Sequence, residues 1–117
     1  MDYRRADRVG DVILQELAFL LQRKVKDPRL EGITLTRVQV NADLRHARVF
    51  YSVLATDEVR AAVAAGLDSA RGYLKRELGS RLKLRYMPEI IFCYDDSLDH
   101  GSRIHRILSE LKKSDVA

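Results

Sequence analysis

The apolar residues of this chain change their spacing at Asp27-Pro28, and that change limits the folds the chain can adopt. From Ala6 to about Lys26 they recur every three to four positions, which predicts an amphipathic helix. Proline ends this helix because it lacks a backbone donor and biases the preceding residue away from helical angles. The segment from Ile33 to Val40 is β-branched and mostly alternating, which predicts a strand. In a regular strand Ile33 and Leu35 would point to one face, and Val38 and Val40 to the other. We therefore expect a bulge near Thr36-Arg37 that brings both pairs to the same face.

The middle of the chain predicts a hairpin followed by two helices. Turn residues precede a second strand, His46 to Leu54, which should pair with the first in antiparallel fashion. Thr56 or Asp57 is expected to cap a helix that runs to Ala70. Gly72 predicts a break with left-handed or restricted backbone angles, and a third helix restarts near Tyr73.

The last third of the chain predicts one more strand and one more helix. Ile90 to Tyr94 lacks polar alternation, so we expect a central or well-covered strand. Acidic and hydroxyl residues after it, Asp95-Asp96-Ser97 and Asp99, offer caps for a final helix that holds Ile104, Ile107, Leu108 and Leu111. Cys93 is the one cysteine of the chain, which excludes an intramolecular disulfide and predicts a buried thiol.

Together these elements predict a single α+β domain over residues 1–117. The expected order is helix-strand-strand-helix-helix-strand with a C-terminal helix, and a three-stranded sheet packed on the helices. A chain of this length buries roughly 65% of its unfolded surface in one core. No apolar run approaches the roughly 18 residues that a membrane span needs, and charged residues replace an apolar signal core at the N-terminus. We therefore expect a cytoplasmic protein.

Nearly all of the excess positive charge lies between Arg71 and Arg85. This segment holds six basic residues against Glu77 alone, and the remaining chain has 15 basic and 16 acidic residues. A localised positive field attracts a polyanion, so nucleic acid is the first partner to expect. A second basic group, Arg4, Arg5 and Arg8, opens the first helix, where cations oppose the helix dipole and hint at a partner.

Catalytic and metal chemistry find little support in the sequence. Asp95, Asp96, Asp99, His100 and His105 have suitable side chains, but the two histidines are five residues apart and the carboxylates are better placed as helix caps. Neither a nucleophile motif nor a glycine-rich phosphate loop is present. Phe50, Tyr51, Phe92 and Tyr94 are interpreted as sheet and core residues, so backbone contact is favoured over base recognition. We predict no enzyme, no cofactor, no metal site and no small-molecule substrate.

The order of elements resembles a type II KH domain, an RNA-binding α+β fold, in which a GxxG loop between two helices clamps phosphate. Here Ala70-Arg71-Gly72 occupies the place of that loop. This replacement and several short motifs resemble the bacterial ribosome-binding factor A family. The motifs are Asp27-Pro28-Arg29-Leu30, Ala47-Arg48-Val49, Leu84-Arg85, Pro88-Glu89-Ile90 and Asp96-Ser97.

The resemblance implies a non-catalytic factor that binds the immature small ribosomal subunit and its ribosomal RNA. It also implies a role in late maturation and RNA processing, most of all in the cold. The altered clamp corresponds to Ala70, Arg71 and Gly72, and the adjoining basic surface to Lys75, Arg76, Arg81, Lys83 and Arg85. We expect a monomer that does not bind membranes. The alternative is a small adaptor whose basic surface binds an acidic protein.

Overall fold

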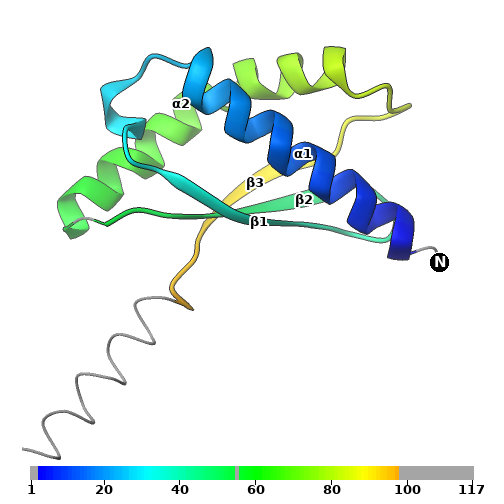
Figure 1. The fold of residues 1–117 in the computed structure, drawn as a ribbon, viewed down its shortest axis with the longest axis horizontal. Helices are drawn as coiled ribbons and strands as arrows, with labels where there is room; N and C mark the ends of the chain where they lie inside the picture. The colour runs from blue at the N-terminus through cyan, green and yellow to red at the C-terminus, as the bar shows by residue number, and fades with distance from the viewer. Residues whose placement is uncertain (1–2, 55, 98–117) are drawn as a thin grey trace, which may run out of the picture.

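The computed structural model describes residues 3–54 and 56–97, which form an α+β fold. The elements are α1 (Tyr3–Arg23), the 3-10 helix η1 (Pro28–Leu30), β1 (Thr34–Val40), β2 (His46–Ser52), α2 (Asp57–Arg81) and β3 (Glu89–Tyr94). The strand order is β1-β2-β3, with β1 antiparallel and β3 parallel to β2. Both helices lie on the same side of the sheet (Figure 1). This arrangement confirms the predicted fold class.

Helix α1 packs closely on β1 because a glycine faces the strand. A Cβ atom added to Gly10 would lie 3.0 Å from the carbonyl oxygen of Val38. Ile13, Leu17 and Leu20, on the buried face of α1, are fully buried. The helix ends at Arg23, before Asp27, whose carboxylate accepts the Arg29 backbone N–H at 2.9 Å and caps η1.

The predicted bulge in β1 is confirmed. Leu35 pairs with Tyr51 and Arg37 with Phe50, so Thr36 is the extra residue. The bulge lets Leu35 and Val38 both pack against the core, while Arg37 is exposed. It therefore determines which side chains lie on the face of the sheet opposite the helices.

The predicted break at Ala70-Arg71-Gly72 is wrong. Thr56 caps α2 as expected, but the helix then continues for 25 residues, and Gly72 does not adopt a positive φ. Figure 1 shows that the ribbon of α2 changes direction along its length. Val63, Leu67, Leu74 and Leu78 form one buried stripe along it. Packing of that stripe outweighs the cost of roughly 1 kcal/mol that a glycine adds inside a helix.

Strand β3 is an edge strand with one face partly exposed, so the prediction of a central or well-covered strand is wrong. The hairpin places β1 on one side of β2, and the α2 crossover returns the chain to the other side. Ile90 is buried under the helices, whereas Ile91 on the opposite face is 38% exposed. Cys93 is half-buried, which corrects the predicted buried thiol. The predicted final helix lies outside the described residues.

Candidate nucleic-acid interface

The three residues expected to replace the phosphate clamp lie in the middle of α2. Ala70 packs against the core, and Gly72 is exposed. The Arg71 guanidinium pairs with Asp68 one turn earlier, at 2.9 Å. These residues therefore point in different directions around a helix and do not form a loop.

Lys75 is held by an acidic residue of the sheet. Its ammonium lies 2.9 Å from the Glu89 carboxylate at the start of β3. The hydrogen bond from Lys75 lowers the pKa of Glu89, and the charges of Lys75, Arg71 and His46 lower it further. Lys75 thus connects α2 to β3, and part of its charge is neutralised.

Arg81 is also engaged within the fold. Its guanidinium lies 3.1 Å from the Glu16 carboxylate and 5.1 Å from the centre of the Phe19 ring. Both partners belong to α1, so Arg81 joins the last turn of α2 to α1. A cation that the sequence indicated for RNA contact has a structural role in this fold.

Arg76 and Lys83 are the cations of this segment on and directly after α2 that are best placed for a partner, and Arg85, also exposed, belongs to a separate pocket. Both Arg76 and Lys83 are exposed, and neither forms an ion pair with a carboxylate in the described part of the chain. Gly72, Arg76 and Gly79 follow one another at helical spacing and define an exposed α2 face, opposite the buried stripe. Nothing lies within 4 Å of a Cβ atom added at either glycine. A phosphate backbone could approach α2 closely there.

A third basic site is assembled by the tertiary structure alone. Arg5 in α1, Arg45 in the β1–β2 turn and Arg85 after α2 line one pocket of about 540 Å³. We call it the three-arginine pocket, and its other lining residues are Asp43, Leu44, Leu84, Tyr86 and Met87. The three segments meet at one end of the molecule, to the right in Figure 1. Sequence analysis indicated Arg5 and Arg85 in separate groups and missed Arg45 and Tyr86.

The two other arginines of the first basic group do not line this pocket. Arg4 and Arg8 are exposed on α1. The structure therefore separates Arg5 from its sequence neighbours, because successive helical residues point about 100° apart. Of Arg4, Arg5 and Arg8, only Arg5 lines a pocket together with Arg85 of the basic segment.

The face of the sheet opposite the helices carries a stacked cation. The Arg37 guanidinium lies 4.0 Å from the centre of the Phe50 ring, within cation–π range. Tyr51 is buried and Phe92 and Tyr94 pack against the core, as predicted for core aromatics. Phe50 lies on the other face, half-buried beneath Arg37, because successive residues of a strand point to opposite faces of the sheet.

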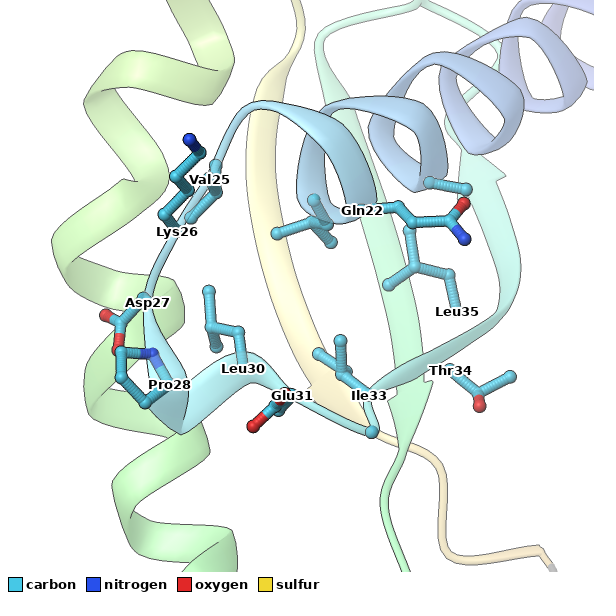
Figure 2. A pocket seen from close by; sticks show the side chains of 13 residues that line it. Gln22, Val25, Lys26, Asp27, Pro28, Leu30, Glu31, Ile33, Thr34 and Leu35 are labelled. Atoms are coloured by element: carbon cyan, nitrogen blue, oxygen red, sulfur yellow. The ribbon is translucent and has the colours of Figure 1, made fainter.

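A separate pocket lies where α1 ends and β1 begins, and Figure 2 shows its lining. Val25, Leu30, Ile33 and Leu35 contribute apolar surface, and Asp27, Lys26 and Glu31 contribute charges of both signs. The Asp27 carboxylate is committed to Arg29, at 2.7 Å. None of the residues predicted to bind RNA lines this pocket, so it offers no concentrated positive field.

The acidic cluster after β3 has a structural explanation. The Asp95 carboxylate accepts hydrogen bonds from the Ser97 backbone N–H at 3.0 Å and the Thr36 hydroxyl at 2.7 Å. Hydrogen bonds from the Ser97 side chain, the Thr36 hydroxyl and the Ser97 backbone N–H lower the pKa of Asp95 to about 2. Asp99, His100 and His105 lie outside the described residues. Within residues 3–54 and 56–97, no three His, Cys, Asp or Glu side chains are grouped to hold a metal ion.

Comparison with known proteins gives the family. A family model described as Ribosome-binding factor A matches residues 5–108. The chain belongs to the ribosome-binding factor A family. Ribosome-binding factor A of Syntrophobacter fumaroxidans is 44% identical over 117 residues, which cover 98% of this chain and 100% of the relative. That of Brevibacillus brevis is 47% identical over 111 residues, covering 95% and 92%.

Solved structures agree with this assignment. The solution structure of a Thermotoga maritima protein, described as a putative ribosome binding factor A, has a TM-score of 0.72 and 31% identity, covering 83% of this chain and 92% of its own. A ribosome-binding factor A structure from Thermus thermophilus has a TM-score of 0.68 at 22% identity, covering 76% and 93%. The second likeness concerns the fold alone.

Neither α1 nor α2, the two α-helices of the described residues, combines the length and the apolar character that a membrane-spanning helix needs.

Proposed function

We propose that this protein is a non-catalytic assembly factor that binds the immature small ribosomal subunit through its RNA. The family supports this function. A homology model of Thermus thermophilus ribosome binding factor A, fitted into the cryo-EM map of a 30S complex, also supports it and shares this fold with a TM-score of 0.64. We further propose a cytoplasmic, monomeric factor that supports late maturation and RNA processing, most of all in the cold.

The exposed cations carry this proposal. Arg76 and Lys83 have no carboxylate partner among the described residues, while Arg71, Lys75 and Arg81 are paired with acids. An unpaired exposed cation gains a partner on binding phosphate, whereas a paired one must first lose its own. We therefore place the main phosphate contacts at Arg76 and Lys83 on and beside the exposed α2 face. Arg71, Lys75 and Arg81 contribute less, and Ala70, Gly72 and Gly79 provide room for the phosphate backbone.

Co-sedimentation with purified small-subunit particles tests this proposal. The Arg76→Ala, Lys83→Ala double variant should bind more weakly, and the magnitude of its salt slope should fall by about 0.7 to 0.9 for each lost contact. The Arg23→Ala, Lys24→Ala double variant is the matched control, because it removes the same charge from exposed residues at the C-terminal end of α1. Equal salt slopes for the two double variants would contradict the assignment of Arg76 and Lys83.

Sucrose gradients of cell extract distinguish an assembly factor from an adaptor for an acidic protein. An assembly factor should migrate with immature small subunits in sucrose gradients of cell extract. It should also rescue growth at low temperature and restore mature small-subunit RNA in cells that lack it. Migration only in ribosome-free fractions would favour the adaptor.

A further inference from the structure

The three-arginine pocket joins segments that lie far apart in the sequence, and hydrogen bonds hold one of them, the β1–β2 turn, against the start of β3. Leu44 adopts a left-handed conformation with φ of 59°, and its N–H donates to the Asn41 carbonyl at 2.8 Å. The Arg45 N–H donates to the Asp43 carboxylate at 3.0 Å, and the Arg45 carbonyl accepts the Glu89 N–H at 2.8 Å. The β1–β2 turn is thus held against the start of β3. The backbone of this turn therefore needs little reorganisation when a ligand binds beside it.

Charge in this pocket favours an anion. Three arginines and one aspartate line it, and in the described part of the chain none of Arg5, Arg45 and Arg85 forms an ion pair. All three are exposed, so their guanidinium groups are free to rearrange around a phosphate. Asp43 reduces the field, but its carboxylate already accepts a backbone N–H.

Tyr86 adds an aromatic surface beside these charges. The residue is 75% exposed, and the Arg85 guanidinium lies 5.5 Å from the centre of its ring. Leu84 and Met87, on either side of this pair in the chain, also line the pocket and are half-buried. An exposed ring beside arginines and apolar side chains suits a flat base that carries a phosphate.

We propose that the three-arginine pocket binds one unpaired nucleotide of RNA, with its base stacked on Tyr86 and its phosphate beside Arg45 and Arg85. This inference rests on the proposed function and names the form of RNA recognised. A paired base in an A-form helix is already stacked and cannot reach an exposed ring, whereas an unpaired base can. The volume of about 540 Å³ lies within the range of roughly 300 to 1,000 Å³ that small-ligand pockets occupy.

The test is fluorescence anisotropy with a labelled single-stranded RNA of about eight nucleotides, a length within the 4 to 16 typical of single-strand sites. Tyr86→Ala should weaken binding roughly 5- to 150-fold, the loss expected for one base–aromatic stack, and Tyr86→Phe should retain binding. Arg45→Ala should lower the magnitude of the salt slope by about 0.7. Arg23→Ala, at the opposite end of α1, is the matched control and should bind as the unchanged protein does.

An RNA that lacks bases but keeps its phosphates separates stacking from charge. The unchanged protein should bind it more weakly, and Tyr86→Ala should cause no further loss, while Arg45→Ala still should. If Tyr86→Ala lowered the affinity for the RNA with bases and for the RNA without bases by the same factor, the stacking assignment would be overturned. Binding of polyglutamate without binding of the RNA would overturn it in favour of a protein partner.

Co-sedimentation with small-subunit particles keeps this inference separate from the proposed function. If Tyr86→Ala leaves both single-strand and particle binding intact, the nucleotide pocket is refuted and the assembly factor stands. If the unchanged protein binds no particles, the proposed function itself fails. Circular dichroism of each variant confirms that the fold is retained.

Discussion

The Lys75 ammonium and the Glu89 carboxylate lie 2.9 Å apart and join the second half of α2 to the first residue of β3. Both side chains are partly exposed, with 40% of Lys75 and 53% of Glu89 accessible. Solvent therefore screens the pair, and an incoming phosphate can compete with Glu89 for Lys75. The pair limits how much of the basic segment's charge is available to RNA.

Replacing Glu89 with Gln should strengthen RNA binding. The substitution releases Lys75 and removes a negative charge near Arg71, so the magnitude of the salt slope should rise by up to about 0.7 to 0.9. Salt titrations of RNA affinity measure this change. Asp57→Asn, which removes a carboxylate at the opposite end of α2, is the control. An unchanged slope for Glu89→Gln would mean that Lys75 does not contact RNA.

The same pair predicts a pH dependence of stability. Because the pKa of Glu89 is held below its ordinary value of 4.5, its ionised form stabilises the fold above that pH. The contribution is lost as the pH falls through the lowered pKa. The stability of Glu89→Gln should therefore fall less steeply with pH below 4.5 than that of the unchanged protein. Acid unfolding followed by circular dichroism measures this difference. Superimposable acid transitions would contradict the ion pair.

Asp95 should titrate at unusually low pH because Ser97 and the bulge residue Thr36 both donate hydrogen bonds to its carboxylate. Its pKa lies at about 2, against an ordinary 3.8, so its ionised form stabilises the fold above pH 3.8 and this contribution is lost toward pH 2. Thr36→Val removes the hydroxyl and should raise the pKa of Asp95, while Thr36→Ser should keep it low. Carboxyl NMR titration gives the values, and an identical pKa in Thr36→Val would disprove the contact.

Two glycines should respond in opposite ways to alanine. Gly72 lies in α2 with open space around it, so Gly72→Ala should stabilise the protein by roughly 0.5 to 1 kcal/mol through helix propensity. Gly10 faces the Val38 carbonyl at 3.0 Å, so Gly10→Ala should destabilise it by about 1 to 3 kcal/mol through overpacking. Thermal or urea unfolding measures both. Destabilisation by Gly72→Ala would instead indicate the restricted backbone angles at Gly72 that the sequence predicted.

Cys93 should react with thiol reagents in the native protein. It is half-buried on the edge strand β3, opposite Phe50 in register, on the face that α1 and α2 leave uncovered. Labelling should be slower than in the unfolded chain but should not require global unfolding. A labelling rate equal to the rate of global unfolding would place Cys93 in a covered position.

Local pattern in the sequence was enough to predict most of the elements. The helical spacing that ends before Asp27, the parity change at Thr36 and the cap at Thr56 each depend on neighbouring residues, and the structure confirms all three. The basic segment could also be found in this way, because charge density is a property of composition. The family followed from the order of short motifs.

Tertiary structure decided the features that depend on distant partners. Gly72 remains helical because a buried stripe runs past it, and β3 is an edge strand because the α2 crossover returns the chain to the outer side of β2. Ion pairs with Glu89 and Glu16, which lie 14 and 65 residues away, engage Lys75 and Arg81, whereas the pair of Arg71 with Asp68 is local to α2. Arg5, Arg45 and Arg85 share a pocket only because three chain segments meet there. Periodicity specifies which face of an element is apolar, but only packing determines which elements and charges become neighbours.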